Sequence, residues 1–320
     1  MIIHRSFSEI SEPLHNPVVT IGNFDGVHLG HREIFRRLKQ AAREGDGVSV
    51  VVTFDPHPLR VVTSTRNIRL INTLEEKITL IEASGVDYLI IIPFDSDFAA
   101  IPSGEFIEKY LIGIIGTRKL IIGYDYAFGR NREGDFAMLC RYGDRFGFTV
   151  EELAPISRGE TTYSSSLIRR MIAAGDVADV VRYLGRHFSL GGRVVHGAHR
   201  GKSLGFPTAN IVTDKELIPA DGVYAVKVKL NDRLYDGACN IGNNPTFGAA
   251  EISIETFIFD FDGELYDQEL RIYFIERLRG EKRFNSTDEL KRAIADDVAN
   301  CRRILAATPL VVYSEYLEGI

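Results

Sequence analysis

Short apolar runs alternate with amphipathic helical patterns over residues 1–185, and this alternation constrains the fold more than any other feature of the chain. The runs have the length of strands and are rich in Val and Ile, which is typical of strands buried on both faces. They are Val18–Ile21, Val48–Thr53, Tyr88–Ile92, Lys119–Ile122 and Thr149–Leu153. Strands that alternate with helices predict right-handed βαβ units and therefore a doubly wound parallel sheet of the α/β class.

The segments between these runs carry helix signals. Thr73 and Glu76 form a capping box at the start of one predicted helix. Apolar residues lie on one face of another, at Ile34, Phe35, Leu38, Ala41 and Ala42. The expected helices are His31–Arg43, Leu74–Ser84, Gly104–Ile112, Asp135–Arg145, Ser165–Ala173 and Asp176–Leu184.

The pattern changes to that of an antiparallel β domain near residue 186. Residues 223–230 alternate apolar side chains with lysines, and Asn231-Asp232 and Asp262-Gly263 read as hairpin turns. The strand-like runs are Val223–Leu230, Arg233–Ile241, Ser253–Phe259 and Glu269–Leu278. We expect a barrel, which hides sheet edges, and a closing helix that starts at Ser286 with Glu289 in its capping box. The predicted domains are residues 1–185 and 186–320.

Composition limits the partners and the compartment. A length of 320 residues allows two domains, and a formal net charge of −6 argues against broad capture of nucleic acid. Three widely spaced cysteines form no disulfide framework, which fits a reducing cytoplasm. We see no signal peptide and no apolar run long enough for a bilayer. We therefore expect a cytoplasmic protein, a monomer or weak homo-oligomer, with small-molecule substrates and no membrane partner.

A glycine-punctuated loop follows the first predicted strand and delivers two histidines to a helix start. Gly22, Gly26 and Gly30 surround His28 and His31. A strand, a tight loop and a helix N-terminus form a phosphate site, because free N–H groups and the helix dipole favour an anion. The histidine pair lacks the further ligands of a zinc site, and the glycines lack the G-x-G-x-x-G spacing of a dinucleotide fold. The loop therefore predicts nucleotide chemistry.

The string G-x-F-D-G-x-H-x-G-H in this loop resembles the signature of flavin-type adenylyltransferases of the nucleotidyltransferase superfamily. The resemblance extends along nearly the whole chain to the family of bacterial bifunctional riboflavin kinases/FMN adenylyltransferases, or FAD synthetases. It implies adenylyl transfer, in which the phosphate of FMN attacks the α-phosphate of ATP and pyrophosphate leaves. Catalysis would rest on positioning and on charge neutralisation by His28, His31, Arg169 and Mg²⁺.

The resemblance also implies substrate contacts in the first half. Those for ATP and its phosphates are Gly22, Phe24, Asp25, Gly30, Ser164, Ser165 and Ser166. Those for the flavin are Asn23, Phe54, His57, Asp125 and Phe128. Taken alone, the serines could simply cap a helix and Asp125 could form an Asx turn. The chain departs from the family at Tyr126, where Phe is usual, and at Ser166, where Thr is usual.

A second set of motifs lies in the β domain. The segment 197–203 is not a P-loop, because His196 stands where the first glycine is required. The run Gly205–Asn210 reads G-F-P-T-A-N and resembles the magnesium and phosphate motif of riboflavin kinases, which implies Thr208 and Asn210 as metal-site residues. Mg²⁺ prefers such oxygen ligands. The family's general base matches Glu255, which would take the proton of the riboflavin 5′-hydroxyl.

The same resemblance assigns further contacts in the β domain. It implies phosphate contacts at Gly197, Arg200, Gly201 and Lys202, and flavin contacts at Arg279 and Phe284. His199 departs from the family, where glycine is common.

The favoured hypothesis is one enzyme that converts riboflavin to FMN and FMN to FAD, each with ATP and Mg²⁺. One alternative is an adenylyltransferase for another phosphorylated acceptor, with a non-catalytic β domain that binds flavin. A second is a protein that stores or senses flavin. The G-F-P-T-A-N run and Glu255 argue against the first alternative, and retention of both histidines argues against the second.

Overall fold

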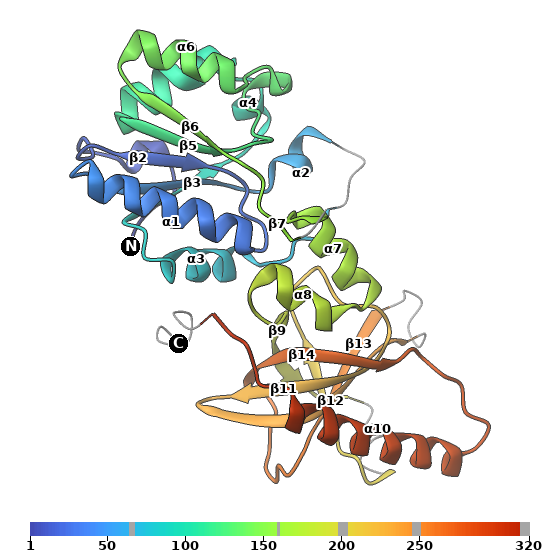
Figure 1. Cartoon of the computed structure of the whole chain (residues 1–320). Helices are drawn as coiled ribbons and strands as arrows, with labels where there is room; N and C mark the ends of the chain where they lie inside the picture. The colour runs from blue at the N-terminus through green and yellow to red at the C-terminus, as the bar shows by residue number, and fades with distance from the viewer. Residues whose placement is uncertain (64–67, 159–160, 198–203, 245–250, 314–320) are drawn as a thin grey trace. The chain divides into compact units, whose positions relative to one another are not determined.

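The computed structural model describes residues 1–63, 68–158, 161–197, 204–244 and 251–313 (Figure 1). The chain forms two compact units, Met1–Ser165 with Tyr313–Ile320, and Ser166–Val312. Of the predicted residues, His199, Arg200, Gly201 and Lys202 lie outside the described part of the chain.

A six-stranded parallel sheet organises the first unit, as predicted. Its strands lie in the order β1-β4-β3-β2-β5-β6. They are β1 (Ile2–His4), β2 (Val18–Ile21), β3 (Ser49–Asp55), β4 (Tyr88–Pro93), β5 (Lys119–Gly123) and β6 (Thr149–Leu153). The sequence did not predict β1, a three-residue edge strand. A separate antiparallel pair is formed by β7 (Ser157–Arg158) and β8 (Thr161–Thr162).

Helices follow the strands of this sheet. They are η1 (Phe7–Glu9), α1 (Leu29–Glu44), α2 (Pro58–Val62), α3 (Leu74–Glu82), α4 (Ser96–Ala99), α5 (Ser103–Glu105), η2 (Phe106–Ile115), η3 (Arg130–Arg132) and α6 (Phe136–Phe146). The capping box of α3 is present as predicted. The helix predicted at 104–112 is instead a short α-helical turn, α5, that continues as the π-helix η2.

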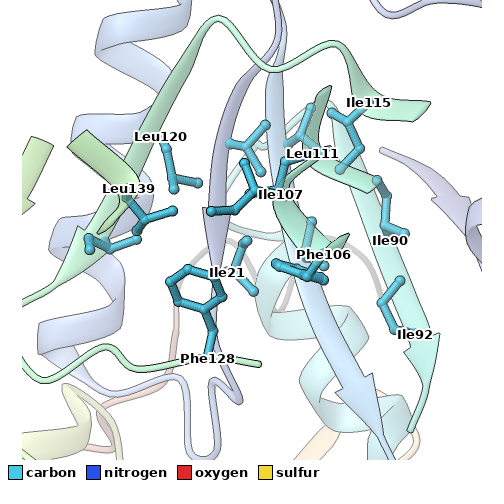
Figure 2. Packing of buried hydrophobic residues seen from close by; sticks show 14 of the residues in the cluster. Ile21, Ile90, Ile92, Phe106, Ile107, Leu111, Ile115, Leu120, Phe128 and Leu139 are labelled. Atoms are coloured by element: carbon cyan, nitrogen blue, oxygen red, sulfur yellow. The ribbon is translucent and has the colours of Figure 1, made fainter. Parts of the chain in front are cut away.

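Alternate residues of the strands belong to two hydrophobic clusters, one on each face of the sheet. Val50 and Val52 of β3 join the cluster with Phe106, Leu111 and Leu139, which Figure 2 shows closely packed around Ile21 and Phe128. Val51 of the same strand joins the other cluster, which also contains Phe35 and Leu38 of α1 and Leu80 and Ile81 of α3. Burial on both faces explains why these strands read as continuous apolar runs.

A closed antiparallel barrel organises the second unit, also as predicted. The strand order is β10-β13-β12-β11-β14-β9, and β9 pairs with β10 to close it. The strands are β9 (Ser189–Val195), β10 (Ala209–Val212), β11 (Gly222–Leu230), β12 (Arg233–Asn244), β13 (Glu251–Ile258) and β14 (Glu269–Arg279). Strands β9 and β10 were not predicted. The closing helix is α10 (Thr287–Ala307), capped by Ser286.

Helices α7 (Ser165–Ala174) and α8 (Val177–Leu184) belong almost entirely to the second unit, whereas the sequence analysis placed them in the first domain. Val177, Val180 and Leu184 are buried, and α8 packs on β14. Arg277 of β14 donates a hydrogen bond to the carbonyl of Ala174, at 3.2 Å. The compact units therefore divide after Ser165, while a functional division after residue 185 stays a prediction.

Candidate active sites

Two stacked imidazoles stand at the start of α1. His28 is the N-cap residue of the helix and His31 lies in its first turn, with ring centroids 3.6 Å apart. A Cβ at residue 30 would lie only 2.9 Å from Cε1 of His28, so Gly30 is the residue that leaves room for that ring. The pair thus lies where the N–H groups and dipole of a 16-residue helix attract an anion.

The loop before these histidines has an unusual backbone. Phe24, Gly26 and Val27 all have positive φ, at 48°, 85° and 39°. The Phe24 ring is buried and contacts His31 edge-on, with centroids 5.2 Å apart. A Cβ at residue 22 would lie 3.0 Å from that ring, which accounts for Gly22. Phe24 therefore supports His31 by packing, and its contact with ATP stays a prediction.

Asp25 holds the loop in place through hydrogen bonds of its carboxylate and its carbonyl. Its carboxylate Oδ1 accepts hydrogen bonds from the backbone N–H groups of Ile71, at 2.9 Å, and Asn72, at 3.4 Å. Its carbonyl accepts one from the Ser165 hydroxyl, at 2.8 Å. The side chain is 3 % exposed, so these bonds satisfy a buried carboxylate. Asp25 and Ser165 are thus in contact and hold the loop, while their predicted contacts with ATP stay predictions.

The loop after β3 lies beside the imidazole loop, because β2 and β3 are paired and parallel. The Thr53 hydroxyl donates to the carbonyl of Asn23, at 3.3 Å. His57 is buried and caps α2, since its Nδ1 accepts the N–H of Leu59 at 3.2 Å. The Nδ1 of His57 is therefore occupied by the cap. The structure brings Asn23 and the Thr53–His57 segment to one sheet edge, as predicted.

Two aromatic residues at this edge were missed by the sequence analysis. The rings of Phe94 and Phe98 contact the Phe54 ring, with centroids 5.4 and 6.2 Å away. Both follow β4, so their position after the third apolar run was the available signal. Together with Phe54 they form a partly exposed aromatic surface of mutually inclined rings at this edge.

The remaining predicted residues of this half lie in different surroundings. Asp125 is exposed in the loop after β5, while Phe128 is 7 % exposed and lies in the core cluster of Figure 2. Burial raises the pKa of Tyr126, the residue between them that departs from the family. The flavin contacts of Asp125 and Phe128 stay predictions, and burial leaves Phe128 little surface for one.

The hydroxyl-rich segment at the start of α7 straddles the two compact units. Ser164 and Ser165 belong to the first unit, whereas Ser166 and Arg169 belong to the second. Arg169 donates a hydrogen bond from its guanidinium to the Ser166 hydroxyl, at 3.1 Å. The predicted role of these residues at the phosphates of ATP stays a prediction.

A second polar cluster lies on neighbouring strands of the barrel. Glu255 of β13 is in register with Asn210 of β10 and with Asn240 of β12. Its carboxylate accepts hydrogen bonds from the hydroxyls of Ser253, at 3.1 Å, and Thr208, at 3.4 Å. Strand pairing sets Asn210 beside Glu255, and the hydroxyl of Thr208 reaches the same carboxylate, so the three residues lie together; their metal and base roles stay predictions.

Residue 197 must be glycine for a steric reason that the sequence did not show. A Cβ at this position would lie 2.0 Å from Nδ2 of Asn210. The Asn210 side chain therefore packs directly on the backbone of Gly197. This close approach explains the glycine without a phosphate, and the predicted phosphate contact stays a prediction.

The two predicted flavin contacts of the barrel are close to each other. The Arg279 guanidinium is paired with the carboxylate of Asp297 on α10, at 2.7 Å, and lies 5.6 Å from the centre of the Phe284 ring. Arg279 thus ties β14 to the closing helix. Its contact with a flavin stays a prediction.

Among the described residues, no group of three or more His, Cys, Asp or Glu side chains could hold a metal ion. Thr208, Asn210 and Glu255 nevertheless offer hydroxyl, amide and carboxylate oxygens, and Mg²⁺ binds through few such protein ligands plus substrate phosphates. The barrel cluster therefore fits this ion. Within the same described ranges, no helix has the length and apolar character needed to cross a membrane.

Comparisons with known proteins match both halves of the chain. A family model described as FAD synthetase matches residues 10–167, and one described as riboflavin kinase matches residues 184–305. The bifunctional riboflavin kinase/FMN adenylyltransferase of Escherichia coli K12 is 34 % identical over 96 % of this chain and 99 % of its own length. The protein of the same description from Pseudomonas fluorescens is 38 % identical over 90 % and 93 %.

A solved structure is similar over nearly the same length. A crystal structure from Streptococcus pneumoniae, described as a macrolide-efflux protein, superposes with a TM-score of 0.86 and 32 % identity. It covers 94 % of this chain and 98 % of its own. The likeness therefore includes both halves of the chain.

Proposed function

The chain belongs to the family of bifunctional riboflavin kinases/FMN adenylyltransferases, and from this we propose how its residues divide the two reactions. The enzyme phosphorylates riboflavin to FMN and adenylylates FMN to FAD, with ATP in each step. The observation that carries our division is that each family model contains one polar cluster. The imidazole pair lies within residues 10–167, and the Thr208–Asn210–Glu255 cluster within residues 184–305. A β domain without catalysis is accordingly not supported.

In the proposed adenylyl transfer, an oxygen of the FMN phosphate attacks the α-phosphorus of ATP. A new P–O bond forms, the bond to the β-phosphate breaks, and pyrophosphate leaves. No protein nucleophile is needed, so positioning and electrostatics supply the catalysis. His28 and His31 stabilise the growing negative charge at the start of α1, and Arg169 supplies a further positive charge. The aromatic surface of Phe54, Phe94 and Phe98 is supported as the flavin platform by its place at the same sheet edge.

In the proposed kinase reaction, Glu255 accepts the proton of the riboflavin 5′-hydroxyl as that oxygen attacks the γ-phosphorus of ATP. The bond to the β-phosphate breaks and ADP leaves. Two hydroxyls hold the carboxylate of Glu255 in place, which supports its role as a fixed base. Thr208 and Asn210 would hold Mg²⁺, which neutralises phosphate charge when bound.

We also propose the cellular setting. A net charge of −6 supports an enzyme that binds no nucleic acid. Three cysteines, all free, support a reducing compartment such as the cytoplasm. The enzyme would work there as a monomer or weak homo-oligomer, with its catalytic domains dividing near residue 185.

The test of this division is a pair of variants that fail in opposite steps. Glu255→Gln should lower riboflavin phosphorylation by about 10²–10⁴-fold, the usual contribution of a general base, and leave FMN adenylylation unchanged. His31→Ala should lower adenylylation by about 10²–10³-fold and leave phosphorylation unchanged. Chromatography that separates riboflavin, FMN and FAD measures both steps in one sample. Loss of both activities in either variant would contradict the division.

A further inference from the structure

A buried lysine lies next to the imidazole loop and has no role in the proposed adenylyl transfer. Lys77 of α3 is 6 % exposed. Its ammonium donates hydrogen bonds to the carbonyl of Phe54, at 3.3 Å, and to the hydroxyl of Thr53, at 3.4 Å. Burial lowers the pKa of Lys77, an effect that the carboxylates of Asp25 and Asp55 oppose. Burying an ammonium is unfavourable, so we expect its position to serve a function.

The contacts of Lys77 continue to both loops of the adenylyltransferase site. The Thr53 hydroxyl, which meets the ammonium, also meets the carbonyl of Asn23 at 3.3 Å. Asn23 lies in the loop that leads to His28, and Phe54 is the penultimate residue of β3, just before the segment that leads to His57. The ammonium therefore binds the end of β3 directly, and the Thr53 hydroxyl continues the connection to the loop that follows β2.

Asp25 completes this connection from the other side. Its carboxylate accepts the N–H groups of Ile71 and Asn72, which directly precede α3. The segment just before α3 is thus hydrogen-bonded to the imidazole loop. About one turn into the helix, Lys77 is hydrogen-bonded to the end of β3. Both links are buried, so water does not compete with them.

We propose that Lys77 is a positioning residue for FMN adenylylation, which sets the imidazole loop relative to the loop that carries Phe54 and His57. The inference rests on the proposed function. Adenylyl transfer without a protein nucleophile depends on alignment of two substrates, and displacement by about 1 Å can reduce such a rate by about 10²-fold. An apolar side chain at residue 77 would occupy most of the same space but would donate no hydrogen bond to Thr53 or Phe54, so the Thr53 hydroxyl that contacts Asn23 would lose its own donor.

The first experiment separates a positioning role from a merely structural one. Lys77→Met keeps an unbranched side chain, one atom shorter, and removes the buried charge, so the thermal midpoint should stay equal or rise. In contrast, kcat for adenylylation should fall about 10- to 100-fold, with KM for ATP changed by less than about threefold. Riboflavin phosphorylation by the same chain serves as the internal control. Lys109→Met, the same change at an exposed lysine of the same unit, should leave both activities unchanged.

A second pair of variants tests the Thr53 hydroxyl, which accepts from Lys77 and donates to Asn23. Thr53→Val is nearly isosteric and favours a buried strand, but it removes the donor to Asn23. Thr53→Ser keeps the donor and leaves a small cavity. We expect Thr53→Ser to be the more active of the two, with Thr53→Val reduced about 5- to 20-fold in kcat.

The outcomes distinguish this inference from the function on which it rests. If the unaltered enzyme forms no FAD from FMN and ATP, the proposed function fails. If it forms FAD and Lys77→Met does so at the same rate, the positioning role of Lys77 is overturned. A fall in activity that follows the loss of thermal stability across Lys77→Met, Thr53→Val and Thr53→Ser would also overturn it, because packing alone would then explain the data.

Discussion

At both proposed sites, close contacts restrict the side-chain conformations of single residues. The ring of His28 occupies the space that Gly30 leaves, and the amide of Asn210 occupies the space that Gly197 leaves. Glu255 receives two hydroxyl donors, so its carboxylate is oriented before a substrate arrives. In the proposed mechanism, such preorganisation would remove reorganisation from the reaction step, which is the main source of electrostatic catalysis.

The buried charge of Lys77 predicts a pH dependence of stability. Because its pKa is lowered in the folded state, the folded chain loses this proton at a lower pH than the unfolded chain, whose lysine has its ordinary pKa near 10.5. At pH values between the lowered pKa of the folded state and 10.5, the unfolded state binds more protons, so the free energy of unfolding rises with pH. Below the folded pKa both states carry the proton and the penalty of burial is complete.

Lys77→Met lacks this contribution, so its stability advantage over the unaltered enzyme should be largest near neutral pH and should shrink as the pH approaches 10.5. Urea unfolding of both proteins at several pH values between 7 and 10 measures the difference, and titrations common to both cancel. A difference that is constant, or that grows with pH, would show that the lysine is not buried as a charged group.

At the scale of elements, the carboxyl ends of the parallel strands bring together residues of the first proposed site, and the register of the barrel brings together residues of the second. Loops after β2, β3 and β4 meet at one edge because these strands are adjacent in the sheet. Helix α3 matters to this edge because its start is fixed to Asp25 and its first turns carry Lys77. The capping box of Thr73 and Glu76 therefore acts on the site through the helix.

Removing that cap should weaken the first unit. The Thr73 hydroxyl accepts the N–H of Glu76, at 3.2 Å, and the Glu76 carboxylate accepts the N–H of Thr73 at the same distance. We expect Thr73→Ala to lower the free energy of unfolding by about 1 kcal/mol, as cap removal usually does. Thr73→Ser keeps the acceptor and should lose about half as much or less. Urea denaturation compares the two, and equal losses would contradict a capping origin.

At the scale of the whole molecule, contacts divide the chain differently from sequence order. Helices α7 and α8 join the barrel unit, and Tyr313 joins the first unit although it follows the barrel in sequence. Tyr313 is 3 % exposed in the cluster that contains Phe35 and Leu38. Its hydroxyl lies 2.8 Å from that of Ser84, and the Arg32 guanidinium lies 4.1 Å from the centre of its ring.

This placement predicts that a residue near the C-terminus stabilises the adenylyltransferase half. Tyr313→Ala should destabilise the first unit by about 3 kcal/mol, because it removes a large buried ring. Tyr313→Phe removes only the hydroxyl contact and should cost about 1 kcal/mol. On heating Tyr313→Ala, FMN adenylylation should be lost at a lower temperature than riboflavin phosphorylation. Equal loss of both activities would assign Tyr313 to the stability of the whole chain instead.

Much of this architecture could be predicted from local sequence. The run Thr149–Leu153 is a strand with the predicted bounds, and the capping signals at Thr73 and Ser286 begin helices as expected. Hydrophobic period and capping act over a few residues, so they are visible in one segment at a time. Strand β1 was missed because three residues carry too little periodic signal, and β10 was missed because it overlaps the G-F-P-T-A-N run, which was read as a motif.

The sequence by itself determined the two kinds of domain and the motifs that mark their chemistry, because patterning and short-range residue spacing express both. Only the tertiary structure decided that Lys77 meets Thr53, that Gly197 receives the side chain of Asn210, and that Tyr313 packs in the first unit. These contacts join residues between 13 and more than 200 positions apart, and their formation depends on how whole elements pack. Packing of that kind leaves no periodic trace in any one segment, which is why it had to be observed.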